Sequence, residues 1–271
     1  MRFARTLAAC LLATALAACQ TLAGLGHGKT HLDRISARGE LRVGLSGDQP
    51  PLNMRTKQGE IVGFEVDLVR ALAGAMGLEV RLVEMPFANL LSALERDEVD
   101  LVISGMTITP ERNARVAFAG PYLVSGKSLL SKSAEVTGVE SPEELDDPAH
   151  GFAALEGSTS EAFAQRELGR ARLVTTSDLD GGVRKVLDGE VDALITDHTF
   201  CQVSVLRHPE AGLSCLQTPF TIEPLGIALP ADDPLFVNLV DNYLVTLRET
   251  AMLARFRVKW FSEGPWLADL P

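Results

Sequence analysis

The segment Ser104–Arg112 combines residue types that could hold an anion. Thr109 suits the N-cap of a short helix and Pro110 suits its first position, so Arg112 falls within the first helical turn. A cation there opposes the helix dipole, which makes sense if the guanidinium serves an anion beside it. Guanidinium groups can grip a carboxylate through two parallel hydrogen bonds. The alternative is that Arg112 pairs with an acid on the surface.

Two short segments could supply further donors to the same anion. Gly105 lets the backbone approach a ligand closely, and Thr107 offers both a hydroxyl and an N–H. Further along the chain, Ser158 and Glu161 fit a capping box at the start of a predicted helix, where free N–H groups can form an anion site. The two uses are compatible, because a capped N-terminus can still present Thr159 outward.

One acid, Asp197, directly follows a predicted buried strand. It can cap the helix that it precedes, as aspartates often do. Alternatively, its carboxylate faces Arg112 across a cleft. A fixed cation and a fixed anion on either side of one gap would suit a zwitterion.

Strands and amphipathic helices that could position these residues alternate along most of the chain. In the segment Phe64–Gly77, for example, Val69, Leu72, Ala73 and Met76 recur at helical spacing. The predicted strands are Leu41–Leu45, Val80–Val83, Leu101–Ser104, Val116–Phe118, Ser128–Ser131, Gly151–Leu155, Arg172–Thr175 and Val191–Thr196. The other predicted helices are Asn89–Asp97, Ser160–Gly169, Leu179–Gly189 and His198–Leu206. This alternation predicts an α/β fold with a largely parallel sheet.

One sequence pattern occurs twice, at Asp97–Ile103 and at Gly189–Ile195. Each copy reads as a helix end, a turn and a buried strand, so we interpret the pair as one similar unit in each of two lobes. The alternative is the coincidence of a common helix–turn–strand pattern. The first strand leads into Ser104–Thr107 and the second into Thr196 and Asp197. Because ligands bind at the carboxyl ends of strands in open α/β sheets, we expect a cleft between the lobes.

The composition restricts the class of protein. The 271 residues are 46% hydrophobic and 23% charged, which is typical of a soluble globular protein with one large or two small domains. The net charge of −11 opposes contact with phosphate backbones and anionic lipid, so we expect no nucleic-acid partner and no polybasic membrane patch. No phosphate loop, nucleophile elbow or metal-ligand cluster is evident, so we predict neither cofactor nor metal.

Residues 1–18 have the pattern of a lipoprotein signal peptide. Arg2 and Arg5 form a basic region, and the apolar run Leu7–Ala18 is too short to span a membrane. The run ends at Cys19 in a sequence that resembles a bacterial lipobox, which implies that this thiol is diacylated. The alternative is ordinary signal-peptidase cleavage, because Ala15 and Ala17 also fit the rule of two small residues separated by one other residue.

The lipobox predicts where the protein is located. A lipid anchor would be its only membrane contact, residues 19–36 would form a solvated tether, and the folded part would lie in the periplasm. In a double-membrane bacterium, Gln20 rather than Asp after the cysteine favours the outer membrane.

Export would place the remaining cysteines, Cys201 and Cys215, in an oxidising compartment. They can form one disulfide that closes a loop of about 15 residues, or they can be two buried free thiols. Two cysteines without ligand spacing argue against a zinc site.

The chain resembles family 3 of the bacterial extracellular solute-binding proteins, the polar amino-acid receptors of ABC importers. The resemblance extends from Leu32 to Phe261 and is strongest at Gly63–Leu68, followed by Leu72, Ala73 and Met76. It also includes Leu41–Gly44, Ser104–Arg112, Pro121–Tyr122, Gly157–Thr159, Val191–Ala193 with Asp197, Pro224–Ala228 and Lys259–Phe261.

The family implies a two-lobed type II periplasmic-binding-protein fold, with mixed, mostly parallel sheets joined by a two-segment hinge. Lobe 1 would comprise residues 37–125 and 222–271, and lobe 2 residues 126–221. The hinge would lie near Tyr122–Lys127 and Thr218–Pro224. The protein would be a monomer that delivers its ligand to an ABC permease.

The resemblance also implies roles for individual residues. Arg112, Thr107 and the backbone at Gly105 would hold the carboxylate of the ligand from lobe 1, and Thr159 would add a contact from lobe 2. The carboxylate of Asp197 would take the ammonium group of the ligand, and the side chain of Phe87 would pack on it. These residues are Phe87, Gly105, Thr107, Arg112, Thr159 and Asp197.

This sequence departs from the family pattern in its first loop, where Gln49 and Leu52 stand at positions that are often aromatic.

The chain also resembles cyclohexadienyl dehydratases in Leu32–Ile35, in Leu206–Pro209 and in its Trp-containing C-terminal tail. These enzymes share the fold and need a proton donor in the cleft. Their pattern places a Glu where this chain has Phe200, and Phe cannot donate a proton; the neighbouring His198 could. We therefore expect a receptor that is not an enzyme. The alternatives are a dehydratase-like lyase and a sensory receptor that signals to a membrane kinase.

Overall fold

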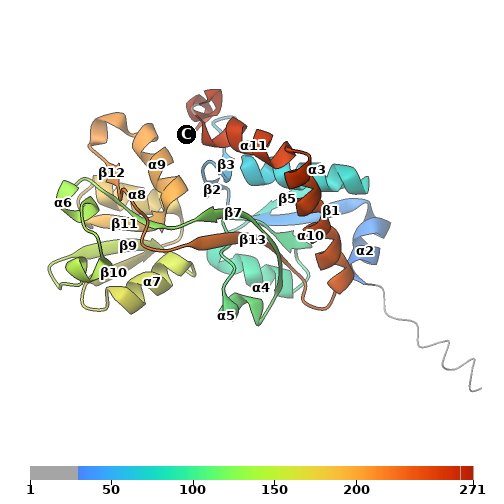
Figure 1. The fold of residues 1–271 in the computed structure, drawn as a ribbon, viewed down its shortest axis with the longest axis horizontal. Helices are drawn as coiled ribbons and strands as arrows, with labels where there is room; N and C mark the ends of the chain where they lie inside the picture. The colour runs from blue at the N-terminus through green and yellow to red at the C-terminus, as the bar shows by residue number, and fades with distance from the viewer. Residues whose placement is uncertain (1–29, 263, 271) are drawn as a thin grey trace, which may run out of the picture.

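The computed structural model describes residues 30–262 and 264–270, and it contains two five-stranded sheets that lie side by side (Figure 1). A separate three-stranded sheet is formed by β2 (Asp48–Gln49), β3 (Asn53–Arg55) and β4 (Ile61–Val62). Helices alternate with the strands of both large sheets, which confirms the predicted α/β class.

The first sheet has the strand order β5-β1-β6-β13-β7. Its strands are β1 (Glu40–Leu45), β5 (Glu79–Glu84), β6 (Leu101–Val102), β7 (Ala117–Ser125) and β13 (Glu223–Leu229). β1 is parallel to β5 and β6, whereas β13 is antiparallel to β6 and β7.

The second sheet repeats this arrangement in the order β10-β9-β11-β8-β12. Its strands are β8 (Lys127–Ser131), β9 (Gly151–Leu155), β10 (Arg172–Thr176), β11 (Ala193–Asp197) and β12 (Ser214–Cys215). β9 is parallel to β10 and β11, and β8 is antiparallel to β11 and β12. The fourth strand of each sheet is thus the first antiparallel one.

The repeated sequence pattern leads into β6 and β11, which are the middle strands of the two sheets. Asp97 and Gly189, at the start of the two copies, both have a left-handed backbone, with φ of 58° and 72°. The aspartates three residues later also act alike. The carboxylate of Asp100 accepts the N–H of Arg42 at 2.7 Å, and that of Asp192 accepts the N–H of Gly151 at 2.7 Å. The repeat therefore reflects two equivalent local structures rather than coincidence.

The five helices predicted from amphipathic patterns match observed helices to within two residues at each end, and α9 is one residue longer than predicted. The observed helices are α2 (His31–Arg38), α3 (Phe64–Met76), α4 (Leu90–Glu95), α5 (Pro110–Asn113), α6 (Ala134–Thr137), α7 (Thr159–Glu167), α8 (Leu179–Leu187), α9 (His198–Arg207), α10 (Pro234–Glu249) and α11 (Met252–Phe261). Short 3-10 turns occur at η1 (Phe87–Asn89), η2 (Pro142–Leu145), η3 (Pro209–Ala211) and η4 (Pro265–Asp269). The predicted apolar face of α3 is buried through Val69, Leu72 and Ala73.

The tether prediction is wrong for its last residues, because positions 31–36 belong to helix α2. Thr30 and Asp33 form a capping box at the start of this helix, and Gly39 ends it in the left-handed conformation. Ile35 is buried against the core of the first sheet, so the helix is held by packing as well as by its caps. The predicted signal peptide and Cys19 lie outside the described residues.

Two segments connect the large sheets, and Figure 1 shows β7 and β13 running between them. β7 leads through Gly126 into β8, and the chain returns from β12 into β13. A Cβ atom at Gly126 would lie 2.3 Å from the carbonyl oxygen of Thr221, so the two connections approach too closely for any larger residue. β7 begins one residue later than the predicted strand Val116–Phe118 but continues to Ser125.

Across the described residues, no helix is both long enough and apolar enough to cross a membrane.

Candidate functional site

A small cavity lies between the two large sheets and brings together most of the predicted ligand-binding residues. It is lined by Gln49, Phe87, Gly105, Lys127, Leu155, Ser158, Thr159, Ser160, Leu179, Thr196 and Asp197. The volume of this cavity is about 20 Å³. That is room for roughly one water, so a larger ligand can enter only if the two sides separate.

Arg112 is buried beside this cavity and bridges its two sides. The hydroxyl of Thr109 accepts the N–H of Arg112 at 3.2 Å, and Pro110 is the first residue of α5, as predicted. The guanidinium donates to the carbonyl oxygen of Thr107 at 3.0 Å and to that of Gly157 at 3.1 Å. Its carbon lies 5.7 Å from the centre of the Phe87 ring, within range of a cation–π contact.

The charge of Arg112 is not neutralised by an ion pair within residues 30–262 and 264–270. This excludes a surface acid in that part of the chain as its partner. Burial lowers the pKa of Arg112, and the negative charges of Glu223 and Asp197 act in the opposite direction. Arginine side chains stay protonated in proteins, so the guanidinium is a buried cation that can accept an anionic partner.

The N-terminus of α7 faces the first sheet at Thr159. The hydroxyl of Ser158 accepts the N–H groups of Ser160 and Glu161, each at 3.2 Å. Glu161 differs from the predicted capping box, because its carboxylate accepts the N–H of Gly157 rather than that of Ser158. The hydroxyl of Thr159 lies 3.3 Å from that of Thr107, so two predicted ligand residues from opposite sides are in contact.

Asp197 does not cap α9, although it occupies the N-cap position. Its Oδ1 accepts a hydrogen bond from the Nζ of Lys127 at 2.7 Å. Lys127 is directly opposite Asp197 in the pairing of β8 with β11, and only 1% of it is exposed. The same Nζ lies 3.7 Å from the carboxylate of Glu223 at the start of β13. Asp197 is therefore part of a buried ion-pair network.

Lys127, Glu223 and Glu65 are not among the site residues predicted from the sequence. The only local signal for Lys127 is a charged residue directly before the predicted strand Ser128–Ser131. The sequence gives no sign that its partners are Asp197 and Glu223, because these acids are distant along the chain.

Gly105, whose backbone the family resemblance places at the ligand carboxylate, makes a contact within the protein. Its N–H donates to Oε1 of Glu65 at 2.7 Å, and the hydroxyl of Tyr122 donates to the same oxygen. Burial raises the pKa of Glu65, and its hydrogen bonds oppose that rise. Gly105 has φ of 57°, and a Cβ there would lie 2.4 Å from the side-chain oxygen of Gln49. Glycine therefore allows Gln49 to lie over the cavity.

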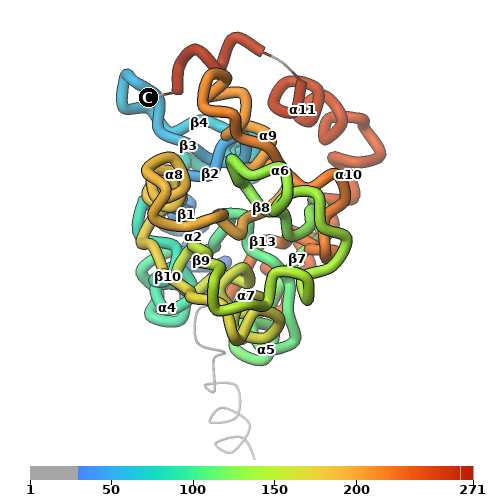
Figure 2. Tube along the Cα trace, turned by 90° about the vertical axis from the view of Figure 1, so that its left-hand side faces the viewer, coloured from blue at the N-terminus to red at the C-terminus, as the bar shows by residue number. Residues whose placement is uncertain are grey.

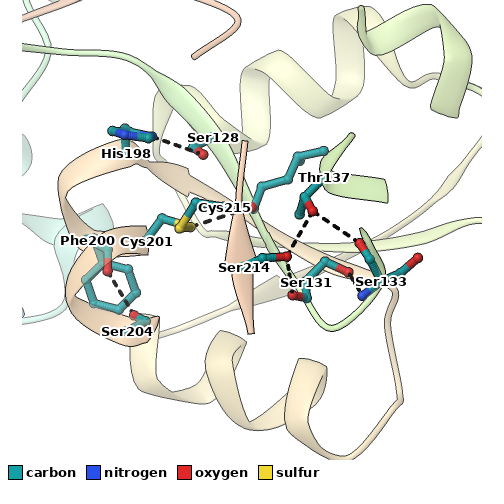
Figure 3. Close-up of a disulfide and its surroundings, with 11 residues drawn as sticks. Ser128, Ser131, Ser133, Thr137, His198, Phe200, Cys201, Ser204, Ser214 and Cys215 are labelled. Carbon is teal, nitrogen blue, oxygen red and sulfur yellow. Dashed lines mark hydrogen bonds between the residues drawn. A yellow bond between two sulfur atoms is a disulfide. The ribbon is translucent and has the colours of Figure 1, made fainter. Parts of the chain in front are cut away.

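Phe200 occupies the first turn of α9 but does not line the cavity. It is buried in an apolar cluster that also contains Leu130 and Ala153. The nearby His198 places its Nδ1 3.4 Å from the hydroxyl of Ser128, and burial lowers its pKa (Figure 3). A lowered pKa favours the neutral imidazole, which is the weaker proton donor, so burial disfavours His198 as a general acid.

Cys201 and Cys215 form a disulfide, with their Cα atoms 6.0 Å apart (Figure 3). The bond ties the first turn of α9 to the edge strand β12. Because α9 begins directly after Asp197, the disulfide restrains the helix that follows this side of the cavity.

Two larger grooves flank the cavity. One lies along α5 and α7 and is lined by Arg112, Thr107 and Thr159. The other is apolar, lies between α9 and α11, and contains none of the predicted ligand residues. Figure 1 and Figure 2 place α5 and α11 on opposite sides of the molecule. The groove along α5 and α7 is the one that contains predicted ligand residues. No cluster of metal-ligating side chains occurs in the part of the chain that the structure describes.

Residues 41–263 match the family model for bacterial extracellular solute-binding proteins, family 3. The chain belongs to this family. Solved structures of the same two-lobed fold include a putative binding component of an ABC transporter from Wolinella succinogenes, complexed with lysine. That protein is 38% identical, with a TM-score of 0.80 over 85% of this chain and 99% of its own.

Other relatives connect this family member to an enzyme. A cyclohexadienyl dehydratase of Pseudomonas aeruginosa is 31% identical over 238 residues, which cover 88% of each chain. An ancestral amino-acid-binding protein, described as a precursor of cyclohexadienyl dehydratase, is 33% identical. Its TM-score is 0.79 over 86% of this chain and 100% of its own. Family membership is therefore compatible with ligand binding and with catalysis.

Proposed function

We propose that this protein is an extracytoplasmic receptor that closes on an amino acid and delivers it to an ABC importer. The observation that carries the proposal is the buried guanidinium of Arg112, which touches both sides of the cavity without an acidic partner among the described residues. A carboxylate is the anion that such a group holds best, through two parallel hydrogen bonds. The amino-acid-binding relatives support the same class of ligand.

The rest of the site supports a zwitterion. Thr107 and Thr159 stand beside Arg112 and would donate hydroxyls to the ligand carboxylate. The second carboxylate oxygen of Asp197 would accept the ammonium group, because the structure pairs only Oδ1 with Lys127. The Phe87 ring, which lines the cavity beneath the guanidinium, would pack on the ligand.

Closure would be a hinge motion between lobe 1, residues 37–125 and 222–271, and lobe 2, residues 126–221. These boundaries separate the strands of the first sheet from those of the second, and they fall at the close approach of Gly126 to Thr221. A ligand that touches both lobes favours the closed conformation over the open one.

A thermal-shift screen against the common amino acids and prephenate, followed by calorimetry, tests the proposed function. At least one amino acid should raise the Tm and bind with a single site per chain. Stabilisation by prephenate with no response to any amino acid would contradict the proposal.

The second candidate function is a dehydratase-like lyase, which the relative from Pseudomonas aeruginosa favours. Such an enzyme must transfer a proton to a leaving hydroxyl, yet Phe200 is buried outside the cavity and His198 has a lowered pKa. We expect no measurable conversion of prephenate to phenylpyruvate or of arogenate to phenylalanine, and weak activity at best in Phe200→Glu. Turnover by the wild type well above the uncatalysed rate would overturn this prediction and make His198 the first residue to mutate.

Asp48 should favour the closed form, because its carboxylate in lobe 1 accepts the N–H of Leu179 in lobe 2 at 2.9 Å. Asp48→Ala should weaken ligand binding by about 1.5 kcal/mol, since a hydrogen bond to a charged group is lost. Calorimetry checks this against Asp188→Ala, an exposed change at the other end of α8. If both variants bind like the wild type, the bond between Asp48 and Leu179 does not contribute to closure.

We also propose that the protein is a periplasmic lipoprotein, anchored through Cys19 and favouring the outer membrane. Cys19→Ser should abolish acylation and release soluble protein, or stall the precursor. Fractionation and mass spectrometry of the native N-terminus check this. An unmodified N-terminus created by cleavage after Ala17 would contradict it.

The proposed partner is an ABC permease, and the proposed oligomeric state is a monomer. A sensory receptor that reports to a membrane kinase would use the same binding site. Neighbouring permease and ATPase genes would favour import over sensing.

A further inference from the structure

The contact between Asp48 and Leu179 joins the two lobes beside the cavity. Oδ2 of Asp48, on β2 of lobe 1, accepts the N–H of Leu179, the first residue of α8 in lobe 2, at 2.9 Å. Leu179 lines the cavity, and so does Gln49, the chain neighbour of Asp48. Separation of the lobes at the cavity would break this bond and expose the carboxylate to water.

The negative charge of Asp48 is buried without a counter-ion when the lobes are closed. Its Oδ1 is buried and has no hydrogen-bond partner, and no ion pair within residues 30–262 and 264–270 includes Asp48. A buried charge of this kind is unfavourable. A neutral carboxyl group could carry its proton on Oδ1 and still accept the N–H of Leu179 through Oδ2.

The elements that pack against β2 supply no free cation to Asp48. These elements are α8 and β3, and each charged side chain on them, with the N-cap residue of α8, is in an ion pair. The pairs are Asp178–Arg184, Asp180–Arg207, Lys185–Glu190 and Arg55–Glu84.

This environment favours the neutral form of the side chain. Burial raises the pKa of Asp48, and the negative charges of Asp180 and Asp178 raise it further. The nearby hydroxyl of Ser46 and the N–H of Leu179 act in the opposite direction. Burial by lobe 2 is thus the main cause of the raised pKa.

We propose that Asp48 makes closure depend on pH, so that the two lobes close most readily when this side chain is protonated. The inference rests on the proposed function, in which the closed conformation holds the ligand. In the open conformation the carboxyl group would face water and have an ordinary pKa of about 4. Because closure raises the pKa, ligand affinity rises as the pH falls through the pKa of the closed form. The rise levels off below the pKa of the open form.

Calorimetry on the full mature chain with L-glutamine, L-serine, L-arginine and L-lysine tests this proposal. None of these ligands changes its charge between about pH 5 and about pH 7. The one that binds most tightly should bind the wild type about threefold more tightly at about pH 5 than at about pH 7.

Two variants isolate the contribution of Asp48. Asp48→Asn keeps an oxygen for the N–H of Leu179 but cannot ionise. It should bind at neutral pH at least as tightly as the wild type, and it should lose the rise in affinity at acidic pH. Asp188→Asn, an exposed change at the other end of α8, is the matched control and should keep that rise. His198 titrates in all three proteins, so the difference between them belongs to Asp48.

The possible outcomes separate this inference from the proposed function. The same pH dependence in the wild type and Asp48→Asn would overturn the inference and leave an amino-acid receptor. Loss of arginine or lysine binding alone in Asp48→Asn would also overturn it, because Asp48 would then serve a ligand side chain. Failure to bind any amino acid in the screen would overturn both proposals.

Carbon NMR of the Asp48 carboxyl group in the wild type gives a second readout that needs no variant. The pKa of Asp48 should be higher with the tightest-binding of the four amino acids than without it, because the ligand favours the closed conformation. The same pKa in both states would overturn the proposal.

Discussion

Arg112→Ala should weaken amino-acid binding by about 2–5 kcal/mol, because the change leaves a ligand carboxylate buried without its cation. The substitution also removes the bonds from the guanidinium to Thr107 and Gly157, which join the two sides of the cavity. The fold of each lobe should remain, since Arg112 lies on the short helix α5 at the edge of the cavity rather than in an apolar cluster. Calorimetry with the amino acid found in the screen measures the loss.

Arg115→Ala is the matched control for this prediction. Arg115 follows α5, but its side chain is about half exposed and pairs with Glu95 on the surface. Surface pairs of this kind contribute little, so the control should bind like the wild type. Unchanged affinity in a folded Arg112→Ala variant would remove Arg112 from the site.

Removing the disulfide should lower the free energy of unfolding by about 3 kcal/mol, as expected for a closed loop of roughly 15 residues. The double variant Cys201→Ser, Cys215→Ser tests this by urea unfolding, with reduced wild type as a second measure. Ligand affinity should change much less than stability, because neither sulfur lines the cavity. The bond joins α9 to β12, which is the edge strand of the second sheet next to β8.

A reductant control separates the disulfide from side effects of the substitutions. Reductant should destabilise the wild type and leave the double variant unchanged. Wild-type stability that does not respond to full reduction would contradict the predicted contribution.

The sequence predicts much of the fold because strands and helices here have strong local patterns. The alternation of apolar strands and amphipathic helices predicts both lobes, and the repeat correctly identifies β6 and β11 as equivalent strands. Helix α2 is not predicted, although Thr30, Asp33 and Gly39 give local cap signals. Most of this eight-residue helix falls within the predicted tether, and its one buried residue is Ile35.

The candidate site is only partly predictable, for a physical reason. Thr109 and Pro110 are local signals, so the helix that positions Arg112 could be predicted from the sequence alone. The contact between Lys127 and Asp197 depends on the pairing of β8 with β11, which no local pattern specifies. Similarly, Glu65 meets Gly105 only after α3 packs against the first sheet. Ion pairs and hydrogen bonds between distant segments appear only in the folded structure.

The most direct test of the account is a crystal structure of the full mature chain. The crystals would be grown with the amino acid that raises the Tm most. We predict that the ligand lies between the two sheets, with its carboxylate on the guanidinium of Arg112 and its ammonium on the free oxygen of Asp197. A ligand bound in the apolar groove between α9 and α11, with Arg112 still bonded only to Thr107 and Gly157, would contradict the account.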